Sequence, residues 1–187
     1  MSIILASQSP RRIELLGQTG WEFQVIPSRF DEDGVTAQTP AELVRKLALG
    51  KARAVLRGDG DIVIGCDTVV ALQNTVFGKP RDREDARRMI TALSGNTHSV
   101  ITGVCILSGA QTVRQFECET KVRFFPLTEK EIEAYIDTDE PYDKAGGYGI
   151  QGKAGLFAES IEGDYNNVVG MPLSRVYREV KALLEGR

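Results

Sequence analysis

The sequence has few of the residues that zinc clusters, disulfide frameworks and membrane spans require. One histidine and three cysteines occur among 187 residues, and no two cysteines form a CxxC pair. This argues against a zinc cluster and indicates reduced, mostly buried thiols. No apolar run approaches about 18 residues, and no basic segment precedes an apolar one near the N-terminus. We therefore expect a soluble, cytoplasmic protein without a membrane segment.

The charge balance and the missing motifs exclude further classes. With 23 basic and 26 acidic side chains, the net charge is −3, so the chain lacks the basic excess of a general nucleic-acid binder. We expect no nucleic-acid partner, although a local basic pocket for a small anion fits this balance. There is no G-x-x-x-x-G-K-[ST] stretch, and no G-x-G-x-x-G stretch follows a strand and opens a helix. These absences disfavour a P-loop or a Rossmann site.

Strand and helix patterns are mixed along the chain. The nearly continuous apolar stretch Ile62–Leu72 is typical of a strand covered on both faces, and Val100–Leu107 with Val113–Phe125 predicts a hairpin. Apolar spacing and capping residues predict helices that begin after Ser9, Thr39, Asp82 and Thr128 and at Leu173. We therefore expect an α/β fold with a mixed central sheet, in one domain over residues 1–187.

The first predicted helix carries two arginines where its dipole disfavours them. Ser9 is a candidate N-cap, Pro10 the first helical residue and Gly17 the residue after the last one. Arg11 and Arg12 then lie in the first turn, where a cation costs about 0.3–1 kcal/mol. An exposed, screened pair would tolerate this penalty. Alternatively, the guanidinium groups, serine hydroxyls and helix N–H groups bind a phosphate, whose charge removes the repulsion.

Asp67 and Lys51 break the local pattern as well. Asp67 lies inside the apolar strand, where an unpaired carboxylate is costly, so it is either a structural, hydrogen-bonded side chain or a metal ligand or general base. Lys51 projects from the apolar helix face between Leu47 and Val55, and either extends to solvent or enters a cleft beside Asp67. Lys79 is a further cation on a loop bounded by Gly and Pro.

Together these side chains supply cations for phosphates and oxygen ligands for Mg²⁺ or Mn²⁺. That combination indicates metal-assisted nucleotide chemistry. His98 has no second histidine or cysteine at ligand spacing, so we interpret it as structural or peripheral.

Eight blocks follow one another along the chain: Ser7–Arg12, Phe30–Glu32, Lys51–Ala52, Gly65–Val70, Gly78–Pro80, Ser94–Ser99, Asp143–Gly152 and Gly163–Pro172. In this order, and over essentially the whole chain, they resemble the Maf family of nucleoside triphosphate pyrophosphatases. The resemblance implies an elongated, inosine-triphosphatase-like α/β domain with two lobes and the site in a cleft between them. It also implies hydrolysis of a nucleoside triphosphate between the α and β phosphates with a divalent cation, Mg²⁺ or Mn²⁺, and a homodimer as a possible assembly.

The resemblance assigns roles residue by residue. Asp67 takes the role of general base, and Glu32 and Asp67 hold the cation. The phosphate-binding residues implied by the motifs are Ser7, Ser9, Arg12, Lys51 and Lys79.

Three positions imply the dTTP/UTP subgroup of the family. Arg11, Thr68 and Gln151 are of the pyrimidine type, whereas enzymes acting on 7-methyl-GTP typically carry Tyr, Trp and Glu there. Gln151 offers both a donor and an acceptor to a uracil or thymine edge. Alternatives remain open: a 7-methyl-GTP-type pyrophosphatase, a pyrophosphatase of modified pyrimidine triphosphates, or a nucleotide-binding regulator of septum formation without significant turnover.

Overall fold

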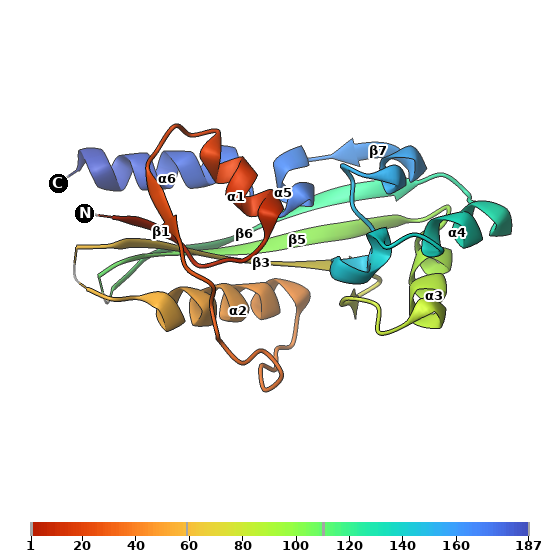
Figure 1. The fold of residues 1–187 in the computed structure, drawn as a ribbon, viewed down its shortest axis with the longest axis horizontal. Helices are drawn as coiled ribbons and strands as arrows, with labels where there is room; N and C mark the ends of the chain where they lie inside the picture. Colours follow the sequence, from red (N-terminus) through yellow and green to blue (C-terminus); the bar gives the residue numbers. More distant parts are fainter. Residues whose placement is uncertain (1, 59, 110, 187) are drawn as a thin grey trace. The chain divides into compact units, whose positions relative to one another are not determined.

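The structure is a computed structural model, and it describes residues 2–58, 60–109 and 111–186 (Figure 1). The chain forms two compact units. The first comprises Met1–Thr68, Thr102–Cys118 and Gly170–Arg187, and the second comprises Val69–Ile101 and Glu119–Val169. Three long strands, β3 (Ile62–Leu72), β5 (Thr97–Ser108) and β6 (Gln111–Phe124), contribute residues to both units.

One seven-stranded sheet runs in the order β2-β1-β3-β5-β6-β7, with β4 (Thr75–Phe77) paired to β3. β1 (Ile3–Leu5) pairs in parallel with both β2 (Phe23–Val25) and β3, while β3–β4 and β6–β7 (Ala158–Glu162) are antiparallel. The predicted mixed sheet and α/β class are therefore confirmed. The bounds of β3 agree with the prediction residue for residue; the predicted turn after Leu107 includes Ala110, which lies outside the described residues.

In the first unit, helices cover both faces of the strands. Figure 1 shows α2 (Pro40–Val55) on one face and α1 (Pro10–Gly17) and α6 (Leu173–Glu185) on the other. β3 is buried from Ile62 to Asp67, as expected for a strand covered on both sides. The core beneath α2 includes Ile4, Ala48, Ala52, Val63 and Cys105.

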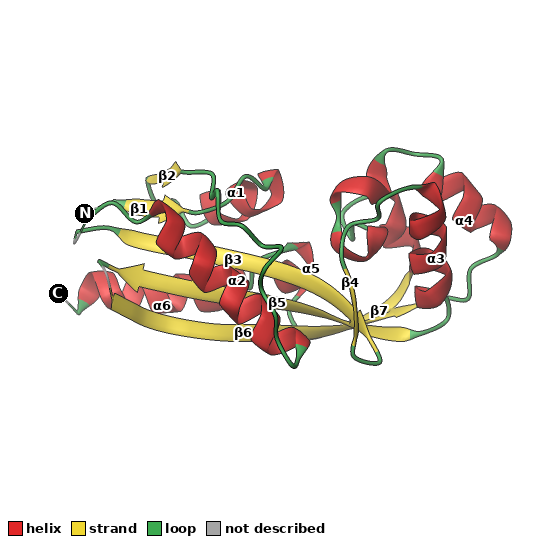
Figure 2. Cartoon of the chain, turned by 90° about the horizontal axis from the view of Figure 1, so that it is seen from below, coloured by secondary structure: helices red, strands yellow, loops and turns green. Residues whose placement is uncertain are grey.

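The second unit packs short helices around an aromatic core. It contains α3 (Arg83–Leu93), α4 (Glu129–Ile136) and α5 (Tyr165–Val169), and Figure 2 shows α3 and α4 side by side. Three 3₁₀ turns complete it: Glu140–Asp143, Ala145–Gly147 and Lys153–Phe157. Its core includes Ile90, Leu93, Phe124, Tyr148 and Phe157. No helix in the described ranges combines the length and apolar character that crossing a membrane requires.

Helix starts follow the predictions more closely than helix ends. Ser9 and Pro10 begin α1 as predicted, but Gly17 is its last helical residue and Gln18 the C-cap. The prediction that Gly17 follows the helix is therefore wrong by one residue. Gly20, two residues after the C-cap, has a φ of 74°, so the left-handed backbone conformation lies beyond the cap.

Two other details of the prediction need correction. The apolar spacing of the last helix, α6, predicts Tyr177 and Leu184 on its buried face, but each is 37% exposed. Tyr177 stacks instead on Trp21, with ring centroids 5.0 Å apart, so an aromatic partner near the surface replaces core burial. The apolar stretch near Leu156–Ile161 predicts a strand, but the strand begins only at Ala158, because Leu156 belongs to a 3₁₀ turn and is 84% exposed.

Candidate functional site

Asp67 is held inside the first unit by an ion pair. It lies on β3, is 8% exposed, and accepts a 2.6 Å hydrogen bond at Oδ1 from Lys51 Nζ. Lys51 Nζ also lies 2.9 Å from Glu32 Oε1. Three sequence-predicted residues therefore meet at one ammonium group, and Glu32, Lys51 and Asp67 are called the carboxylate–lysine cluster below.

The approach of α2 to the sheet makes this cluster possible. A Cβ on Gly65 of β3 would lie 2.3 Å from the carbonyl oxygen of Ala48, and one on Gly103 of β5 would lie 2.3 Å from that of Val44. Both distances are too short for real atoms, so glycine is required for the helix backbone to pack this closely on the strands. The close packing brings Lys51, with its side chain 14% exposed, to the strand that carries Asp67.

The electrostatics of Asp67 suit a proton acceptor. Burial raises the pKa of this carboxyl, and the nearby charges of Lys51 and Arg12 oppose the rise. A carboxylate with a raised pKa is a stronger base than one in water, and the two cations favour its ionised form. The cluster therefore keeps a buried carboxylate available to take a proton.

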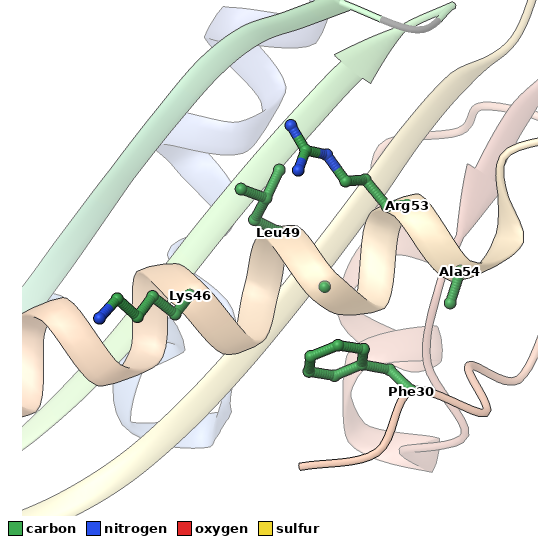
Figure 3. Close-up of a pocket in the computed structure, with 6 residues that line it drawn as sticks. Phe30, Lys46, Leu49, Arg53 and Ala54 are labelled. Atoms are coloured by element: carbon green, nitrogen blue, oxygen red, sulfur yellow. The ribbon is translucent and has the colours of Figure 1, made fainter. Parts of the chain in front are cut away.

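The loop that carries Glu32 is anchored to α2 by Phe30. The Phe30 ring lies directly over Gly50, where a Cβ would come within 2.3 Å of ring atom Cζ. Figure 3 shows this ring against the helix, beside a pocket of about 500 Å³ lined by Lys46, Leu49 and Arg53. That pocket contains no member of the cluster. Glu32 lies two residues after Phe30 and pairs with Lys51, the residue after Gly50. The contact between Phe30 and Gly50 therefore helps to position Glu32 beside Lys51.

The cluster offers a donor set that fits a divalent cation. Mg²⁺ is commonly held by one or two carboxylates, with water and substrate phosphates completing its shell. Glu32 and Asp67 converge on one positive group and supply two such carboxylates. Among the described residues no group of three His, Cys, Asp or Glu side chains forms a complete protein-only site. The arrangement therefore suits a cation shared with a phosphate ligand.

Arg12 is fixed by a second set of contacts in the same unit. Its Nε donates to the Gly170 carbonyl at 2.8 Å and its Nη2 to Thr68 Oγ1 at 2.9 Å. Thr68 Oγ1 in turn lies 2.9 Å from the hydroxyl of the buried Thr102. We call Arg12, Thr68, Thr102 and Gly170 the arginine network. Thr68, which the resemblance implies in base selection, thus also orients the predicted phosphate ligand.

The two serines lie beside the start of α1. Ser7 is buried, and its Oγ accepts from the backbone N–H of Ser9 at 3.1 Å. Ser9 is the N-cap, but its side chain makes no capping hydrogen bond, and the first turn of α1 contains no acidic residue. The helix start thus keeps the anion-binding character expected from the sequence. Arg11 is the second residue of this helix and is half-buried.

The remaining predicted residues belong to the second unit. Lys79 and Gln151 both lie in it and are exposed. Their convergence with the cluster, and the cleft between two lobes, stay predictions of the resemblance. His98 is structural: it is 1% exposed and its Nε2 lies 2.7 Å from Tyr148 Oη. Burial lowers its pKa to about 4.

Thr102 and the Gly170 carbonyl were not predicted from the sequence. Thr102 interrupts an apolar strand, as Asp67 does, and this signal could have identified it. The Gly170 carbonyl could not have been found, because its partner Arg12 lies 158 residues away in the chain. Burial of Cys66 and Cys105 raises their thiol pKa values to about 11 and about 12, as expected for inert thiols.

Comparison with known proteins decides the family. The family model described as "Maf-like protein" matches residues 2–183. The chain belongs to the Maf family. A relative of this Maf chain from Symbiobacterium thermophilum, named dTTP/UTP pyrophosphatase, is 53% identical over 174 residues, covering 92% of this chain and 89% of the relative. A Bacillus anthracis protein of the same name is 48% identical, covering 96% of this chain and 94% of the relative.

A solved structure shares the fold of this Maf chain. The HAM1 protein from Coxiella burnetii superposes with a TM-score of 0.50 at 14% identity, with all of both chains covered. At that identity the likeness concerns the fold alone.

Proposed function

We propose that this Maf-family chain hydrolyses dTTP and UTP to the nucleoside monophosphate and pyrophosphate, and so removes nucleotides from the cellular pool. Modified pyrimidine triphosphates are further candidate substrates. The carboxylate–lysine cluster beside Arg12 carries the proposal, because it joins a buried base to the cations that a triphosphate requires. The names of the two relatives support the substrate class. The cytoplasm is the expected location, where these nucleotides are abundant.

In the proposed reaction Asp67 accepts a proton from water. The water oxygen then bonds to phosphorus, and the P–O bond between the α and β phosphates breaks to release pyrophosphate. A raised pKa favours this proton transfer near neutral pH. Lys51 keeps the carboxylate ionised and adds positive charge where negative charge grows on the phosphates.

Arg12 provides the phosphate contact of the first unit. Its Nε and Nη2 are held by Gly170 and Thr68, so the guanidinium is oriented before substrate binds. The hydroxyls of Ser7 and Ser9 and the N–H groups at the start of α1 complete this phosphate site. We assign Lys79 to the phosphates as well, on the motif Gly78–Pro80.

We propose Glu32 and Asp67 as ligands of Mg²⁺ or Mn²⁺. When bound, the cation would neutralise phosphate charge and orient the triphosphate. The two carboxylates then act on the same substrate from the same cluster.

Base selection is assigned to Arg11, Thr68 and Gln151. Gln151 is exposed and can both donate to and accept from the edge of uracil or thymine. Replacement by glutamate removes the donor, so Gln151→Glu should weaken hydrolysis of dTTP and UTP more than that of other nucleotides. An equal loss on every nucleotide would instead indicate general damage.

A nucleotide panel tests the proposal. Pyrophosphate and orthophosphate release would be measured from dTTP, UTP, CTP, GTP and 7-methyl-GTP, with Mg²⁺, with Mn²⁺ and with a chelator. The proposal predicts pyrophosphate release that is fastest from dTTP and UTP and is lost with the chelator. Preference for 7-methyl-GTP would favour the other subgroup, and binding without pyrophosphate release would favour the regulator.

A further inference from the structure

Gln151 lies on a tight turn that is held in place by one carboxylate, that of Glu140. The Gly152 N–H donates to the Gly149 carbonyl at 3.0 Å, so Gly149–Gly152 forms a turn with the exposed Gln151 as its third residue. An exposed side chain can recognise a base with precision only if the backbone beneath it is fixed. What fixes this turn therefore bears on selectivity.

Glu140 holds the end of the turn. Its Oε2 accepts from the Lys153 N–H at 2.9 Å, and Lys153 directly follows the turn. Its Oε1 accepts from the Tyr135 hydroxyl at 3.2 Å and from the Ala154 N–H at 3.4 Å. A carboxylate only accepts hydrogen bonds, so it can satisfy all three donors at once.

Tyr135 orients the Glu140 carboxylate. The Tyr135 hydroxyl donates to Glu140 Oε1 at 3.2 Å, so it supports the group that holds the turn. Tyr135 is 3% exposed and its ring packs edge-on against Phe157, with centroids 5.1 Å apart. The carboxylate that holds the end of the turn is thus itself held by a rigid, buried ring.

The glycine at position 152 is explained by the same carboxylate. A Cβ on Gly152 would lie 2.2 Å from Glu140 Oε1 and 2.4 Å from its Cδ. The Glu140 carboxylate therefore lies where the side chain of any other residue at position 152 would be. The turn therefore requires glycine at position 152 for Glu140 to bind in this place.

We propose that Glu140 is a positioning residue for substrate selection, which holds the Gly149–Gly152 turn so that Gln151 presents its carboxamide to the base. The inference rests on the proposed function, in which Gln151 reads the pyrimidine. Glu140 itself contacts the turn and not the nucleotide. Its loss therefore changes which base is preferred more than it changes the chemical step.

The test compares Glu140→Gln with Glu159→Gln as a matched control. Glu159 is an exposed glutamate of the same unit whose Oε2 pairs with Arg123 at 2.6 Å, away from the turn. The readout is the ratio of kcat/KM for UTP to that for CTP, since these nucleotides differ only at the base edge. Loss of a charged acceptor should lower this ratio about tenfold, mainly through KM for UTP, with kcat changed little. Glu159→Gln should leave it unchanged.

Tyr135→Phe supplies a second variant that keeps the buried ring. It removes only the hydroxyl that donates to Glu140, so the ratio should fall about threefold, roughly the worth of one hydrogen bond. Amide hydrogen exchange at Lys153 and Ala154, whose N–H groups donate to Glu140, should accelerate in both variants, which reports the turn independently of activity. If Glu140→Gln does not fold, Tyr135→Phe alone decides the outcome.

Two results overturn the proposal. An unchanged UTP:CTP ratio in the folded variants, or an equal loss on all nucleotides with faster exchange throughout the unit, shows that Glu140 is only structural. Gln151→Glu, assayed in parallel, separates this from failure of the proposed function. If Gln151→Glu shifts the ratio and Glu140→Gln does not, only the positioning role fails. If Gln151→Glu has no effect, the base-selecting role of Gln151 fails as well, while the nucleotide panel decides the proposed hydrolysis separately.

Discussion

The first unit holds its carboxylate–lysine cluster by ion pairs between side chains, and the second holds its functional turn by hydrogen bonds from backbone N–H groups to one carboxylate. Asp67, Lys51 and Glu32 form ion pairs of 2.6 and 2.9 Å, and Arg12 is oriented by a carbonyl and a hydroxyl. In the second unit, the Lys153 N–H directly after the Gly149–Gly152 turn donates to Glu140, and the adjacent Tyr148 contacts the neutral, buried His98.

This difference matches the two tasks that the proposed reaction requires. Stabilising charge on a triphosphate needs cations and a base whose pKa is shifted, and the first unit supplies both. Reading a pyrimidine edge needs a fixed amide with a donor and an acceptor, and a rigid turn supplies that. The comparison predicts that substitutions in the carboxylate–lysine cluster change the rate, and that those in the Gly149–Gly152 turn change the preference among bases.

Asp67→Asn should have the largest effect. The amide cannot take a proton from water, so kcat should fall about a thousandfold, while the free energy of unfolding changes little because the size is kept and a buried charge is removed. Measuring kcat and thermal unfolding checks both halves. Asp61→Asn, directly before β3, is the control for the loss of a negative charge, and its turnover should stay near that of the wild type. Near-normal turnover in Asp67→Asn would refute the role of Asp67 as the base.

His98 should give the next largest effect, and on stability. Its pKa is about 4 in the folded chain and about 6.5 when unfolded, so as pH falls below 6.5 only the unfolded state gains this proton and the folded state loses stability. Between pH 7 and pH 5 this amounts to about 2 kcal/mol, or about 30-fold in the folding equilibrium. Urea unfolding at both pH values should show this loss in the wild type and much less of it in His98→Gln, since the chain has one histidine. The same pH dependence in both proteins would contradict a buried neutral His98.

Gly50→Ala should disturb the cation site at a distance. The new Cβ would lie 2.3 Å from Phe30 Cζ, so the ring and the loop that carries Glu32 must move. We expect the Mg²⁺ concentration for half-maximal rate to rise about tenfold, the worth of one charged ligand contact. Gly17→Ala is the matched control, because nothing lies within 4 Å of a Cβ there. An unaltered Mg²⁺ dependence would show that Phe30 does not position Glu32.

Thr102→Val should have the smallest effect. It keeps the shape of a buried side chain but removes the hydroxyl beside Thr68, so Arg12 is oriented less well. KM should rise about three- to fivefold for every triphosphate, in line with one hydrogen bond, with kcat unchanged. Thr97→Val, at an exposed position at the start of β5, serves as control. A change in base preference without a change in KM would contradict the role of Thr102 in orienting Arg12.

Local signals explain what could be predicted from the sequence. The bounds of β3 and the capping box of Thr128 depend on neighbouring residues and are confirmed. At Thr39 the same motif is only half formed: Thr39 Oγ1 accepts from Glu42 N–H, but Glu42 accepts from Gln38 N–H. Which neighbour a flexible glutamate selects is not contained in the motif.

The residues of the candidate site divide in the same way, into those with a local sequence signal and those whose role depends on the fold. Asp67 and Lys51 break apolar patterns and could be found from the sequence, and the structure joins them. Glu140 and Tyr135 could not, because Glu140 accepts from a backbone N–H 13 residues away and Tyr135 acts through Glu140. A glutamate before a proline and a tyrosine on an apolar helix face look ordinary until the fold places them beneath Gly149–Gly152.

The most direct test of the account is the UTP:CTP ratio of kcat/KM in Asp67→Asn and Gln151→Glu, measured side by side. The account predicts that Asp67→Asn lowers both rates by the same large factor and leaves the ratio at the wild-type value, whereas Gln151→Glu lowers the ratio. A shifted ratio in Asp67→Asn, or an equal loss on both nucleotides in Gln151→Glu, would contradict the separation of chemistry from base selection.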